Sequence, residues 1–224
     1  MFWDPTILIV LPALIFTFWA QINVNSTFEK YSKLRTKSDM TGYDAARRIL
    51  DANNLQHVSI EKTIGTLTDH YDPRANVIRL SEGVYHSISA AAVGVAAHEA
   101  GHAVQHARGY FPIKVRQAII PMTRIGSFLA MPLFIIGLFL AIPALVYVGI
   151  AFYSAATLFQ LVTLPVEFNA SRRAMEALRG SYLNKEELDA SKKVLTAAAL
   201  TYVAALASSL LTLLRLLVIA NRRR

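Results

Sequence analysis

The chain has 224 residues, a formal net charge of +8 and an apolar fraction of 54%. Its Lys and Arg residues do not gather into a basic stripe, and no nucleic-acid-binding motif is present, so we expect no nucleic-acid partner. The sequence contains no cysteine, which excludes disulfides and thiolate metal sites.

The N-terminal segment, residues 1–22, is predicted to be a transmembrane anchor. Pro5 to Ile22 carries no charge, and Trp3 and Trp19 suit the two membrane interfaces. A cleaved signal peptide is the alternative, but the sequence begins Met-Phe-Trp-Asp and lacks both a positive start and a clear small-residue cleavage site. An uncleaved anchor is therefore favoured.

Residues 23–118 have the composition of ordinary soluble protein, and their pattern predicts strands followed by a helix. Thr41 and Asp44 form a capping-box pattern that opens a helix through about Ala52. Short strands are expected between Val58 and Leu80. The last of them, Asn76–Leu80, is either an edge to which an extended peptide adds or one more strand of a small sheet.

An Ala-rich helix follows from about Ser87 to Ala107, and Gly109 supplies the signal that ends it.

Residues 119–164 are predicted to form a transmembrane hairpin. The uncharged run from Ile125 to Val166 is 42 residues long, whereas one span needs about 20. Two helices joined by a turn at Ala141-Ile142-Pro143 account for this length. Arg124 stands at the edge, where its side chain can reach the interface.

The rest of the chain is predicted to form a cytoplasmic helix, residues 165–193, and a last transmembrane helix with a basic tail, residues 194–224. Asn184 and Glu187 form a second capping-box pattern at the start of the long helix. Its Ala, Ser and Thr residues suit close packing in a helix bundle.

The distribution of Lys and Arg predicts the orientation in the membrane. Residues 23–118 hold twelve of them, residues 167–193 hold six and the first five residues hold none. Both large polar regions are therefore expected in the cytoplasm. With four spans the Arg222–Arg224 tail would lie outside, against the rule, so either the tail is tolerated or the last helix does not cross fully.

The Ala-rich helix contains His98-Glu99-Ala100-Gly101-His102, the H-E-x-x-H pattern. Two histidines four residues apart lie on one helical face and can bind one zinc ion. Glu99 is then placed to act as general base on a metal-bound water. Gly101 is costly inside a structural helix and would allow a close approach by another segment.

A catalytic zinc ion needs a third protein ligand. His106 is rejected, because eight residues of helix put it about 12 Å from His98 along the axis. Glu167, at the end of the uncharged hairpin, is the better candidate, since an ionisable group there is costly and often functional. The alternative is a surface glutamate paired with Arg172 or Arg173.

These residues resemble a known family. His98–His102, Leu164-Pro-Val-Glu167-Phe, Asp69-His-Tyr-Asp-Pro73 and Val77–Ser81 are similar to the YugP-type neutral zinc metallopeptidases, which are multi-pass membrane proteins of prokaryotes. A more distant similarity is to the HtpX and prenyl-endoprotease membrane peptidases.

The resemblance implies a gluzincin arrangement, in which His98, His102 and Glu167 hold one zinc ion per chain and Glu99 is the general base. The broader group tends to carry an aspartate four residues after the glutamate, to orient a ligating histidine. Here that position is Ser171, so Ser171 or the nearby Asn169 is expected to supply the partner.

Together these features predict an α+β, mainly helical fold: a zincin-like unit with a small sheet, fused to about four transmembrane helices. The expected function is zinc-dependent hydrolysis of internal peptide bonds in membrane-associated or misfolded proteins, at the cytoplasmic side of the cell membrane. The expected partners are a polypeptide substrate and the lipid bilayer.

An inactive membrane scaffold that retains the H-E-x-x-H helix is the alternative, and a transporter or channel subunit ranks last because the spans are nearly all apolar. His70 or Tyr71 could stabilise an oxyanion, although Asp72-Pro73 alone predicts a plain turn. His57 and His86 are expected to be surface or packing residues.

Overall fold

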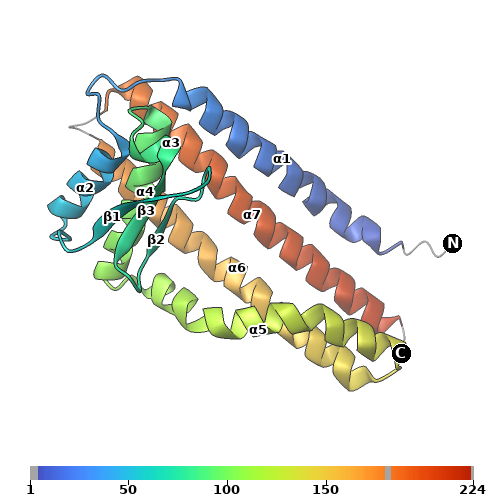
Figure 1. Cartoon of the computed structure of the whole chain (residues 1–224). Coiled ribbons are helices and arrows are strands. Elements are labelled where there is room, and N and C mark those ends of the chain that lie inside the picture. The colour runs from blue at the N-terminus through green and yellow to red at the C-terminus, as the bar shows by residue number, and fades with distance from the viewer. Residues whose placement is uncertain (1–4, 180–182, 223–224) are drawn as a thin grey trace. The chain divides into compact units, whose positions relative to one another are not determined.

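The structure, a computed structural model, describes residues 5–179 and 183–222. Trp3 and the tail residues Arg223 and Arg224 therefore lie outside the described residues. The elements, in chain order, are α1 (Ile7–Ser32), α2 (Gly42–Ala52), β1 (Ser59–Thr63), β2 (His70–Asp72), β3 (Val77–Ser81), α3 (Glu82–Tyr85), α4 (Ala90–Ala107), α5 (Phe111–Phe139), α6 (Pro143–Leu178) and α7 (Lys185–Asn221). The predicted fold class, mainly helical with a small sheet, is confirmed (Figure 1).

Four helices, α1, α5, α6 and α7, are long and apolar enough to cross a membrane. This agrees with the four spans expected from the sequence. Large apolar side chains on these helices are exposed, and Phe128 and Phe139 have 78% and 88% of their surface accessible. Exposed apolar area of this kind is costly in water, so a bilayer is the environment that suits it.

The described residues divide into two compact units. One comprises residues 5–21, 114–165 and 200–222, and the other comprises residues 22–113, 166–179 and 183–199.

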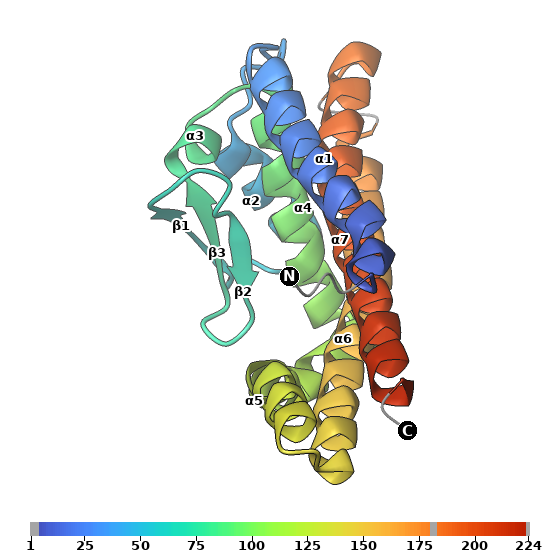
Figure 2. The same cartoon turned by 90° about the vertical axis from the view of Figure 1, so that its right-hand side faces the viewer.

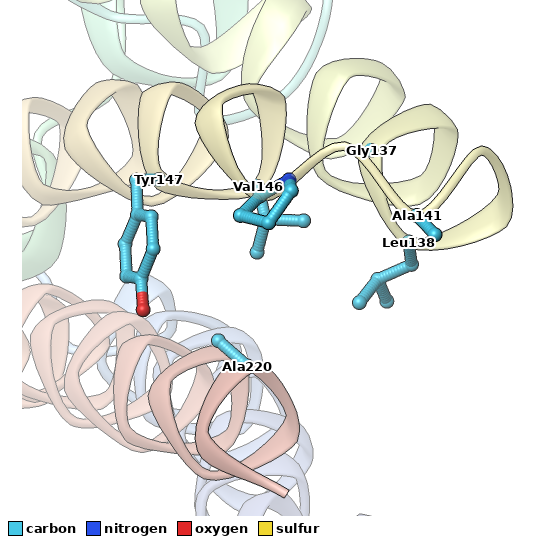
Figure 3. A pocket seen from close by; sticks show the side chains of 7 residues that line it. Gly137, Leu138, Ala141, Val146, Tyr147 and Ala220 are labelled. Atoms are coloured by element: carbon cyan, nitrogen blue, oxygen red, sulfur yellow. The ribbon is translucent and has the colours of Figure 1, made fainter. Parts of the chain in front are cut away.

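In the first unit, α5 and α6 form the predicted helical hairpin. The turn between them falls at residues 140–142, where Ala141 adopts a positive φ of 55°. Helix α7 packs against α6 through small polar residues, since the hydroxyl oxygens of Thr157 and Ser209 are buried 2.7 Å apart. Figure 3 shows a pocket in this unit, and none of the predicted metal ligands lines it.

In the second unit, the strands form a three-stranded sheet in the order β1-β3-β2. Strand β1 pairs with β3 in parallel, and β2 pairs with β3 in antiparallel fashion (Figure 2). The hypothesis that Asn76–Leu80 is an edge strand is therefore wrong. Strand β3 is central, and both of its sides are already hydrogen-bonded to neighbouring strands.

Both predicted capping boxes are present. The Thr41 side chain accepts a hydrogen bond from the backbone N–H of Asp44, and the Asp44 side chain accepts one from the backbone of Thr41. At the start of α7, Asn184 and Glu187 exchange the same pair of bonds, each 3.0 Å long. These contacts satisfy backbone donors that a helix start leaves without intrahelical partners.

Helix α4 forms the centre of the second unit and lies beside the sheet (Figure 2). Its N-cap is Ser89, whose hydroxyl accepts a hydrogen bond from Ala92, and Gly109 follows its end with a positive φ of 62°. Most residues of this helix are buried, and most of the buried ones are alanine or glycine. Their small size lets other segments pack closely against the helix. The helix that carries the H-E-x-x-H pattern is therefore held on several sides.

Candidate metal centre

The second unit brings the three predicted ligands together. His98 and His102 lie on consecutive turns of α4, and Glu167 lies on α6. Their metal-binding atoms form one group within 4.8 Å of one another. Glu167 has only 2% of its surface exposed.

The approach of α6 to α4 depends on Gly101. A Cβ at this position would lie 2.7 Å from the carbonyl oxygen of Ala170. Gly101 was predicted from the sequence to allow a close approach, and this contact shows that α6 makes it. Gly101 stands between the two histidines, and Ala170 is three residues after Glu167, so the contact sets the distance from the histidine pair to the carboxylate.

The three ligand atoms have the spacing that a zinc ion requires. Nε2 of His98 and Nε2 of His102 are 3.1 Å apart, and Oε2 of Glu167 is 3.3 Å and 3.4 Å from them. Ligands at about 2.0–2.2 Å from a tetrahedral zinc ion are about 3.3–3.5 Å from one another. The observed triangle fits this value closely, and its donors, two imidazoles and one carboxylate, are those of many catalytic zinc sites.

Each histidine has a polar partner on its other ring nitrogen. The Ser171 hydroxyl lies 3.1 Å from Nδ1 of His98, and Oε1 of Gln105 lies 3.0 Å from Nδ1 of His102. Ser171 or Asn169 was the partner expected from the sequence. Ser171 contacts the predicted ligand His98 directly, whereas Asn169 contacts Gln105.

Gln105 is a residue of the site that was not predicted from the sequence. It follows His102 by three residues, so the two side chains share one face of α4. A large amide inside an otherwise small-residue helix was the available signal, because a buried polar group needs hydrogen-bond partners.

The charge of Glu167 affects the neighbouring histidine. Burial lowers the pKa of His102, but hydrogen bonding to Glu167 and the charge of that carboxylate raise it, and the net pKa lies above its ordinary value. Protons and a metal ion compete for His102, so metal affinity at this residue depends on pH.

Glu99, the predicted general base, is 8% exposed. Among the described residues its carboxyl group has no hydrogen-bond partner. No fully buried side-chain oxygen among the described residues lacks a hydrogen-bond partner, so the Glu99 carboxyl oxygens are not sealed off from solvent.

The remaining candidates lie elsewhere. His106 is in the last turn of α4, with its ring 6.1 Å from that of Tyr71, as expected for a histidine at a helix end. Nδ1 of His70 contacts the carbonyl oxygen of Thr68. His57 and His86 are both exposed.

The chain is similar to known families of peptidases. A family model described as "Putative neutral zinc metallopeptidase" matches residues 6–221. A protein of Bacillus subtilis (strain 168), "Putative membrane protease YugP", is 50% identical over 215 residues, which cover 95% of each chain. No solved structure matches.

Proposed function

This chain belongs to the neutral zinc metallopeptidase family, and we propose that it is a membrane endopeptidase with one zinc ion, held by His98, His102 and Glu167. The observation that supports this assignment most directly is the triangle of ligand atoms, whose sides of 3.1–3.4 Å match a tetrahedral zinc site. The donor set of two histidines and one distant glutamate corresponds to the gluzincin arrangement.

In the proposed mechanism Glu99 is the general base. Zinc, when bound, polarises the substrate carbonyl and lowers the pKa of a water molecule to about 7. The Glu99 carboxylate accepts a proton from the attacking water and later delivers it to the leaving amine. Glu99 adjoins His98 in the chain, and its charge acts on the proposed ligand His102, so it lies close enough to the site for this transfer.

The proposed substrates are membrane-associated or misfolded polypeptides. Glu167 follows the apolar part of α6 directly, which puts a ligand of the site close in sequence to a candidate membrane span. The proposed location is the cell membrane, crossed several times, with the site on the cytoplasmic side. This orientation rests on the excess of Lys and Arg in residues 23–118 and 167–193.

The alternative is a membrane scaffold that has kept the H-E-x-x-H helix and lost activity. A scaffold has no need for stoichiometric zinc or for a general base. Metal analysis of the purified protein, together with a cleavage assay, separates the two functions.

The test compares wild-type protein with Glu99→Gln, using an unfolded protein such as casein as substrate. We expect Glu99→Gln to keep its zinc and to lose cleavage by at least about 100-fold, because general base catalysis contributes roughly that factor or more. Glu186→Gln is the matched control, since Glu186 is an exposed residue in the first turn of α7. Wild-type cleavage by Glu99→Gln would show that the assigned mechanism is wrong, and a wild-type protein without zinc or cleavage would favour the scaffold.

A further inference from the structure

Gln105 connects the two helices of the metal centre. Its side chain is completely buried, and its amide group makes three contacts. Oε1 faces Nδ1 of His102 at 3.0 Å, while Nε2 donates to the Val166 carbonyl oxygen at 2.8 Å and to Oδ1 of Asn169 at 2.9 Å. One side chain of α4 thus binds a ligand histidine and the segment of α6 on either side of Glu167.

We propose that Gln105 is a positioning residue for the metal centre: it dictates which nitrogen of His102 is available to the metal and holds the Glu167 segment against α4. This inference rests on the proposed function only in taking the centre to bind zinc. It does not require that the bound metal hydrolyses peptides.

Two hydrogen-bond acceptors on α6 determine the orientation of the Gln105 amide. The Val166 backbone carbonyl can only accept a hydrogen bond. Nε of Arg173 can only donate, and it lies 2.8 Å from the Asn169 side chain, so the atom of Asn169 that it contacts must be the oxygen. Gln105 therefore faces two acceptors, Val166 and Asn169, and must present its NH₂ group to both.

The tautomer of His102 follows from this orientation. Since the NH₂ group of Gln105 points to α6, its carbonyl oxygen points to Nδ1 of His102, and this nitrogen must carry a hydrogen. In the neutral ring Nε2 then carries the lone pair that a metal ion can bind, and it is the atom that faces His98 and Glu167. Hydrogen bonds of this kind fix the tautomer and the orientation of metal-binding histidines.

The same amide also restrains Glu167. Val166 and Asn169 are one residue before and two residues after the carboxylate, so the two bonds from Gln105 hold this turn of α6 at a fixed distance from His102. A ligand carboxylate must be placed within about 0.2 Å for good zinc geometry.

The experiment measures the zinc affinity of the full-length purified protein by competition with a chelator, and the melting temperature without metal. Gln105→Met keeps the length of the side chain but can neither donate nor accept these bonds. We expect its zinc affinity to fall about 10–100-fold. Ser191→Ala is the control, because it removes another buried bond to α4, from the Ser191 hydroxyl to the Ala90 carbonyl oxygen, without a connection to the ligands.

Two variants of Asn169 test the network without altering α4. Asn169→Asp keeps an acceptor for both Gln105 and Arg173 and is expected to bind zinc at least as tightly as wild type. Asn169→Leu removes the acceptor and is expected to bind zinc more weakly. These variants remain informative if Gln105→Met does not fold.

The inference would be overturned by wild-type zinc affinity in Gln105→Met, or in Asn169→Leu if Gln105→Met does not fold. It would also be overturned if Ser191→Ala lost as much affinity as Gln105→Met at a similar melting temperature, since the effect would then be general destabilisation. A protein whose zinc affinity depends on Gln105 but which cleaves nothing would refute only the peptidase function.

Discussion

Gly101 on α4 lies so close to Ala170 on α6 that an added Cβ at residue 101 would be 2.7 Å from the Ala170 carbonyl oxygen. This contact brings the histidine pair and Glu167 within reach of a single ion. A glycine thus contributes to the metal centre by the absence of a side chain.

We predict that Gly101→Ala weakens zinc binding and destabilises the fold. Restoring an ordinary contact of 3.4 Å requires a shift of about 0.7 Å, several times the tolerance of about 0.2 Å for a metal ligand. Overpacking costs about 1–3 kcal/mol, against a gain of about 1 kcal/mol in helix propensity. Chelator competition and thermal melting measure the two effects.

Gly83→Ala is the control for this substitution. A Cβ at Gly83 would meet nothing within 4 Å, so this variant is expected to match the wild type in zinc affinity and to melt no lower. If Gly101→Ala behaved like Gly83→Ala, the close contact would not determine the geometry of the centre.

Local signals predicted much of this structure. The two capping boxes, the helical hairpin and the H-E-x-x-H helix depend on residues within a few positions of one another. The central position of β3 was not predictable in this way, because strand order depends on pairing between distant segments. The role of Gln105 was missed for the same reason, since its acceptors on α6 are 61 and 64 residues away in the chain.

We predict that Glu167→Gln lowers zinc affinity by more than about 100-fold. Loss of a direct ligand must exceed the 10–100-fold that is typical of losing a partner of a ligand. The neutral amide keeps the size of the side chain, so the fold is expected to persist, which circular dichroism can verify. Stoichiometric zinc in this variant after dialysis against a chelator would remove Glu167 from the ligand set.

Asp69 is predicted to make stability depend on pH. Burial raises the pKa of this carboxyl group, hydrogen bonds from Ser81 lower it and the charge of Glu99 raises it, and the net pKa lies above the ordinary 3.8. Its contribution to stability is therefore fully present below pH 3.8 and is lost as the pH rises through the higher pKa of the folded state. We expect Asp69→Asn, compared with wild type, to melt at a progressively higher temperature as the pH rises from about 3.5 to about 7.5.

For Asp72→Asn, we expect the difference in melting temperature from wild type to change with pH in the opposite direction. Hydrogen bonds from the backbone of Arg74 and the side chain of Arg79 hold the pKa of Asp72 below its ordinary value. The stability that Asp72 contributes is present at neutral pH and is lost as the pH falls. Both variants are measured without metal, because zinc binding itself depends on pH. A pH-independent difference in melting temperature for Asp69→Asn would contradict the account of its burial.

The proposed orientation in the membrane predicts which residues a membrane-impermeant maleimide can label on intact cells. The natural chain contains no cysteine, so single cysteines give no background. Ile64 is 97% exposed between β1 and β2, and Leu140 is 57% exposed at the turn between α5 and α6. We expect Leu140→Cys to be labelled on intact cells and Ile64→Cys only after permeabilisation, because regions rich in Lys and Arg are generally retained in the cytoplasm. The reverse pattern would place the metal centre outside the cell and would exclude cytoplasmic polypeptides as its substrates.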